Sequence, residues 1–167
     1  DGDGVLDLGV GAYLDDDGGP DRGAAWLLYL NSDGPVKGQA KLSSISGGIA
    51  GVLDDNDQFG ISVSGLADLD GDGIREIAVG AARDDDGGTD RGAAWLFFMN
   101  ADGTVKTERK FSDLSGDFNG TLDDLICDGA CAPLEQIEAA ARQYRRARSD
   151  AEQPLHSIDR RQPDLNS

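Results

Sequence analysis

The sequence has few of the residues that most often carry enzyme chemistry or covalent cross-links. Its 167 residues include one histidine and two cysteines. The single histidine, His156, lies in a polar C-terminal segment, which argues against a histidine-activated nucleophile. Cys127 and Cys131 are too few for a disulfide framework, and with His156 they fall short of the four ligands of a structural zinc site. Catalytic carboxylate pairs are not excluded by count, but no pair stands out, and we predict that the chain is not an enzyme.

Basic residues are also scarce. Fifteen Lys and Arg face 32 Asp and Glu, which gives a net charge of −17 and a pI of about 4.1. This balance argues against nucleic acids and anionic membranes as partners, and no apolar run approaches the ~20 residues of a membrane span. Binding of divalent cations fits such a charge, and a halophilic surface is the alternative explanation.

The chain contains an internal repeat with a spacing of 69 residues. By our alignment, 32 of the 55 positions in residues 1–55 are identical to their partners in residues 70–124. The shared segments include an Asp-Gly-Asp-Gly run, an Asp-Asp-Asp-Gly-Gly turn and an Asp-Arg-Gly-Ala-Ala-Trp-Leu run. Such identity indicates a tandem duplication.

Short apolar segments alternate with turns rich in Gly and Asp, which is typical of an all-β fold. We expect strands near Asp7–Ala12, Ala24–Leu30, Val36–Leu42, Gly60–Leu66, Glu76–Ala81, Ala93–Met99 and Val105–Phe111. Ala93–Met99 is apolar on both faces, so we expect it to be covered on both sides, with Trp95 and its counterpart Trp26 in the core. A stack of four-stranded propeller blades fits this pattern and the repeat length.

An acidic loop offers oxygen ligands at alternating positions. Asp68, Asp70, Asp72 and Glu76 are predicted to converge, with the Ile74 carbonyl as a fifth ligand. Hard oxygen ligands in this number suit calcium. An EF-hand is excluded, because position twelve of the loop is a valine and the flanking segments read as strands. A solvated acidic turn without an ion is the alternative.

The first copy of the loop is shorter by one ligand. It offers the carboxylates of Asp1, Asp3 and Asp7 and the carbonyl of Val5, so we expect it to bind calcium weakly or not at all. The turns 15–17 and 84–86 are either a second cation site or solvated hairpin tips, and their spacing favours the tips.

These motifs together resemble the FG-GAP repeats of integrin α-chain propellers and of many secreted bacterial proteins. The resemblance is carried by Phe59-Gly60, the loop 68–76, Val79-Gly80-Ala81 and Gly92-Ala93. It implies an incomplete β-propeller of about two blades, each a four-stranded antiparallel sheet, with structural calcium in an extracellular protein. The sequence departs from the family where alanine and tyrosine, at Ala82 and Tyr13, replace the proline of the "GAP" element.

The repeat divides the chain into three predicted parts. Residues 1–58 form a first blade, truncated at its N-terminus, and residues 59–124 form a second blade with a complete calcium loop. Residues 125–167 form a tail outside the repeat, with a helix over about 133–148 followed by disorder. The tail is either a native cap or a sequence artefact.

The resemblance implies a binding or adhesion module that takes an unknown protein, cell-surface or glycan ligand and contacts neighbouring blades. A purely structural spacer and an accessory part of a larger secreted enzyme are the alternatives.

Overall fold

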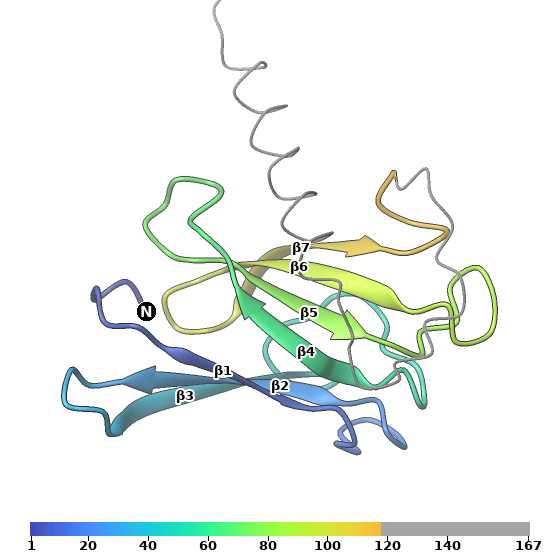
Figure 1. Ribbon diagram of the computed structural model, residues 1–167, viewed down its shortest axis with the longest axis horizontal. Helices are drawn as coiled ribbons and strands as arrows, with labels where there is room; N and C mark the ends of the chain where they lie inside the picture. Colours follow the sequence, from blue (N-terminus) through green and yellow to red (C-terminus); the bar gives the residue numbers. More distant parts are fainter. Residues whose placement is uncertain (118–167) are drawn as a thin grey trace, which may run out of the picture.

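The computed structural model describes residues 1–117, which form two antiparallel sheets (Figure 1). The first sheet has the order β1-β2-β3 and the second the order β4-β5-β6-β7. The strands are β1 (Leu8–Ala12), β2 (Ala24–Leu30), β3 (Val36–Ser43), β4 (Phe59–Gly65), β5 (Ile77–Ala81), β6 (Ala93–Met99) and β7 (Val105–Phe111). The all-β prediction is confirmed. The predicted tail 125–167, with its helix over about 133–148, lies outside the described residues.

The two sheets repeat one another in register. Val10 of β1 lies opposite Trp26 of β2, and Val79 of β5 lies opposite Trp95 of β6. Both sheets also have a register shift near the end of an equivalent strand, β2 in the first sheet and β6 in the second. Within residues 1–117 the first sheet has no equivalent of β4, as expected from the alignment.

The main hydrophobic core lies between the sheets. Phe59, Trp95 and Phe97 of the second sheet form its aromatic centre, with the Trp95 and Phe97 rings stacked 5.9 Å apart. The first sheet contributes small and aliphatic side chains, including Ala25 and Leu42, both with 0% exposure. Large rings on one sheet thus pack on small residues of the other.

The Phe59-Gly60 pair lies in direct contact with the backbone of the first sheet. The Phe59 amide donates a hydrogen bond of 3.0 Å to the carbonyl of Arg22, and Phe59 forms a parallel bridge with Gly23. Gly60 has a φ of +91°, and its missing Cβ leaves room for the backbone of Ala24. The backbones of the two sheets therefore meet directly at this pair.

The prediction that both tryptophans are buried is correct for Trp95 and wrong for Trp26. Trp95 is 2% exposed, whereas Trp26 is only half-buried. Strand residues alternate between faces, so Trp26 points away from the second sheet, toward the face that also carries the exposed side chains of Leu8 and Val10. No described residue forms a sheet over that face.

The expectation that β6 is covered on both sides is confirmed. Trp95, Phe97 and Met99 belong to the core between the sheets, and Leu96 and Phe98 are buried in a second cluster on the opposite face.

The described residues include no helix long and apolar enough to cross a membrane.

Candidate metal centre

The loop of residues 68–76, called the Asp68 loop below, joins β4 to β5. Its carboxylates hold the backbone in a series of tight turns. The Asp68 carboxylate accepts hydrogen bonds from the amides of Gly71 (2.6 Å) and Gly73 (2.9 Å). Asp70 and Asp72 each accept one from the amide two residues further on, at 3.2 and 2.8 Å. Gly71 and Gly73 have φ values of +82° and +90°, a conformation that favours glycine.

The predicted carboxylate ligands converge. One oxygen from each of Asp68, Asp70, Asp72 and Glu76 can be chosen so that all four lie within 4.8 Å of one another. In the part of the chain that the structure describes, this is the group of acidic side chains with the spacing of a metal site. A set of carboxylate oxygens is the donor chemistry that calcium prefers. Participation of the Ile74 carbonyl stays a prediction.

Glu76 is the buried member of the group. Its side chain is 1% exposed, and Oε2 accepts a hydrogen bond of 2.6 Å from the Leu69 amide. Burial raises the pKa of Glu76 above its usual value, and the negative charges of Asp70 and Asp68 raise it further. A cation among these oxygens would oppose both effects, since it favours the charged carboxylate.

A positive charge already lies at the Asp68 loop. The Lys106 ammonium, which comes from β7, is 2.7 Å from Asp70 Oδ2 and 2.7 Å from Asp72 Oδ2. These contacts raise the pKa of Lys106, and the hydrogen bond from Lys106 lowers the pKa of Asp72. The ammonium therefore compensates the charge of two of the predicted ligands. The residues fit a metal ion through their donor set, four carboxylate oxygens within 4.8 Å of one another. Lys106 was not predicted as part of the site, although it is the counterpart of Lys37 in the repeat.

The loop of residues 1–7, called the Asp1 loop below, has the same local turns but a different arrangement of carboxylates. The Val5 amide donates to Asp3 Oδ1 at 2.8 Å, as the Ile74 amide does to Asp72. Lys37 bridges Asp1 and Asp3. Asp7, however, accepts hydrogen bonds from the Leu30 amide (2.9 Å) and the N-terminal ammonium (3.1 Å). The predicted role of the Val5 carbonyl stays untested.

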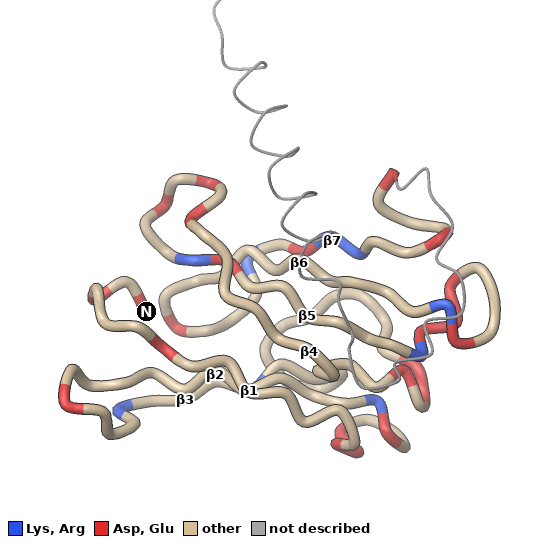
Figure 2. The backbone as a smooth tube through the Cα atoms, in the orientation of Figure 1, with Lys and Arg blue, Asp and Glu red and all other residues tan. Residues whose placement is uncertain are grey.

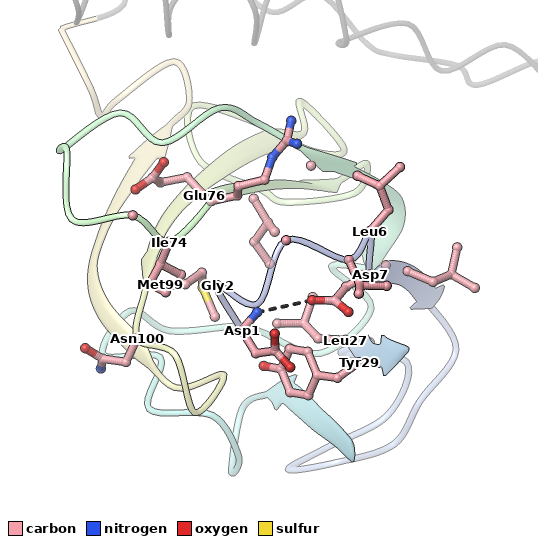
Figure 3. A pocket seen from close by; sticks show the side chains of 18 of the residues that line it. Asp1, Gly2, Leu6, Asp7, Leu27, Tyr29, Ile74, Glu76, Met99 and Asn100 are labelled. Carbon is pink, nitrogen blue, oxygen red and sulfur yellow. Dashed lines mark hydrogen bonds and ion pairs between the residues drawn. The ribbon is translucent and has the colours of Figure 1, made fainter. Parts of the chain in front are cut away.

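Both loops line one cavity of ≈ 570 Å³. Figure 3 shows Ile74 and Glu76 on one side of it and Asp1 and Asp7 on the other, with the ion pair between the Asp1 ammonium and Asp7 drawn as a dashed line. Tyr29 from β2 also lines the space. Both loops thus lie at the same end of the two sheets (Figure 1).

The acidic turns 15–17 and 84–86 lie at the opposite end of the strands, where acidic residues also gather (Figure 2). Lys110 bridges Asp84 (2.6 Å) and Asp86 (2.8 Å), and its ammonium lies 5.2 Å from the centre of the Trp95 ring. Lys41 makes the equivalent contacts in the first sheet. A lysine therefore compensates each turn, as Lys106 does at the Asp68 loop. Among the described residues the group of converging carboxylates lies in the Asp68 loop and includes neither turn, which favours a hairpin tip over a second cation site.

A search of curated proteins found no match to the chain. A comparison with protein families found a match for one segment of the chain. This segment holds the Phe59-Gly60 pair, the Asp68 loop, strands β4 and β5 and most of β6. Residues 59–97 match the family model of the FG-GAP repeat, so this part of the chain carries an FG-GAP repeat.

Proposed function

We propose that this chain is a calcium-binding part of an extracellular β-propeller, in which calcium has a structural role and the propeller serves in binding or adhesion. The FG-GAP match indicates a β-propeller-like repeat module. The observation that carries the calcium assignment is the convergence of four carboxylates in one loop within the matched segment.

Asp68, Asp70, Asp72 and Glu76 would hold the ion, with the Ile74 carbonyl beside them. Bound calcium supplies positive charge and a set of oxygen-directed bonds. Asp68 and Glu76 stand at the two ends of the loop, next to β4 and β5, so their ligation would tie these strands together. The loop amides already orient Asp68, Asp70 and Asp72, which reduces the ordering needed for binding.

Contact with a neighbouring blade is the second part of the proposal, and the outer face of the first sheet supports it. Leu8 and Val10 are 51% and 40% exposed there, while their repeat partners Ile77 and Val79 are 7% and 0% exposed in the core between the sheets. The equivalent side chains of the second sheet are thus covered by the first sheet. A blade placed on Leu8 and Val10 would cover them in the same way.

The test is calorimetric titration of the full chain with calcium, with magnesium as the comparison ion. We expect one calcium per chain with a Kd of ~10⁻³ M or lower, as in extracellular calcium modules. Glu76→Gln should weaken binding by roughly tenfold, because it removes a ligand charge from a buried position. Asp7→Asn, the matched change in the Asp1 loop, should leave the Kd within about twofold. Absence of calcium binding by the wild-type chain would refute the proposal.

A further inference from the structure

Lys106 connects β7 to the Asp68 loop. It lies on β7, which is the edge strand of the sheet opposite β4 (Figure 1). Its ammonium contacts the loop that joins β4 to β5. It donates hydrogen bonds of 2.7 Å to Asp70 and 2.7 Å to Asp72. Contacts of this length between charged groups are among the stronger hydrogen bonds of proteins.

The carboxylates that Lys106 contacts are two of the four proposed calcium ligands. A calcium ion at those oxygens and an ammonium beside the same oxygens would repel each other strongly, because the separation is only a few ångströms. Lys106 can move away without a change in β7, since its charge is carried on a flexible four-carbon stem. Its side chain is 40% exposed, so water can take over the hydrogen bonds of the released ammonium.

The same arrangement occurs in the other copy of the repeat. Lys37 of β3 contacts Asp1 at 2.8 Å and also Asp3, and these three residues precede Lys106, Asp70 and Asp72 by 69 positions. The lysine is therefore part of the repeated unit. Its recurrence at both acidic loops indicates a role toward the carboxylates.

From this geometry we infer that Lys106 is a tethered competitor of calcium, and that this residue sets the calcium affinity of the Asp68 loop. The inference rests on the proposed function. The ammonium neutralises Asp70 and Asp72 when no ion is bound and leaves when calcium binds, so the loop alternates between two cations. Calcium binding thereby frees one positive charge on the surface of β7.

The test compares Lys106→Met with Arg109→Met in the full chain. Both remove one positive charge from an exposed position of β7, but Arg109 donates its hydrogen bond to the Glu108 carbonyl. Lys106→Met should tighten the calcium Kd by about 3- to 10-fold, the size expected for loss of a partly exposed pair of ionic contacts. Arg109→Met should change it by less than about twofold. Without calcium, Lys106→Met alone should lower the melting temperature, because the repulsion between loop carboxylates is no longer compensated.

A charge-preserving variant, Lys106→Arg, should bind calcium no more tightly than the wild type. An unchanged or weaker Kd in Lys106→Met, beside measurable binding by the wild type, overturns the competition and leaves the proposed function intact. Equal tightening by Lys106→Met and Arg109→Met also overturns it, because overall charge then accounts for the effect. Absence of calcium binding in every variant overturns both proposals.

Discussion

Gly60 packs against the backbone of Ala24 so closely that a Cβ on Gly60 would overlap the Ala24 carbonyl group. The φ of Gly60, +91°, is also a value that side chains disfavour. The preceding residue, Phe59, places its ring edge-on to Trp95 and Phe97, at centroid distances of 6.4 and 5.9 Å. The pair thus combines a buried ring with a close approach of two backbones, which explains why phenylalanine is followed by glycine here.

Gly60→Ala should destabilise the fold strongly. The new methyl group meets both an unfavourable φ and the backbone of the first sheet, and we expect a loss of more than about 2 kcal/mol in the free energy of unfolding. Gly65→Ala in the same strand is the control, because a Cβ there meets no atom within 4 Å. Urea denaturation should show a change of less than about 1 kcal/mol for the control. Similar losses in the two variants would contradict this account of the pair.

Trp26 and Trp95 should contribute differently to stability, although they occupy equivalent positions in the repeat. Trp95→Ala removes a side chain that is 2% exposed and should cost about 3–5 kcal/mol. Trp26→Ala removes a half-buried side chain and should cost less than about 2 kcal/mol. Both variants lose a lysine–ring contact, so that contribution largely cancels in the comparison. Equal costs by chemical denaturation would show that the outer face of the first sheet is covered in solution.

Asp57 should make stability depend on pH. Its side chain is 3% exposed, and burial, with the nearby charge of Asp84, raises its pKa to about 7, although the Asp54 amide and Lys110 act in the opposite direction. In the unfolded chain the group titrates near 3.8. Between these values the folded state binds more protons than the unfolded state, so stability falls as the pH rises from about 4 to about 7.

The variant Asp57→Asn should remove this component of the pH dependence. We expect it to stabilise the fold at pH 8 by about 1–3 kcal/mol relative to the wild type, and to have little effect near pH 4. Asp33→Asn, a change at an exposed position, should leave the pH profile unchanged. Thermal unfolding across pH 4–8 provides the comparison. A wild-type advantage over Asp57→Asn that grows with pH would contradict the assignment.

The repeat and most of the fold were predictable because they depend on local pattern. Alternating apolar residues between Gly- and Asp-rich turns placed each strand to within a residue or so, and the 69-residue spacing predicted which strand the first sheet lacks. The convergence of Asp68, Asp70, Asp72 and Glu76 also followed from spacing within one loop.

Contacts between residues far apart in the chain could not be predicted from the sequence. Lys106 reaches the Asp68 loop only because β7 lies at a particular place in the sheet, and Asp57 is buried only because the loop before β4 lies near Asp84 and Lys110. The exposure of Trp26 was mispredicted because pattern identifies an apolar face and leaves open what covers it.

Under the proposed function, the Asp68 loop binds calcium and the Asp1 loop contributes little. The most direct measurement is the rise in melting temperature on calcium addition for wild type, Asp72→Ala and Asp3→Ala, which are matched positions in the two loops. Calcium at 100 times its Kd should stabilise the wild type by about 2.7 kcal/mol. Asp72→Ala should abolish most of this rise, and Asp3→Ala should retain most of it. Equal losses in both variants, or no rise in the wild type, would contradict the account.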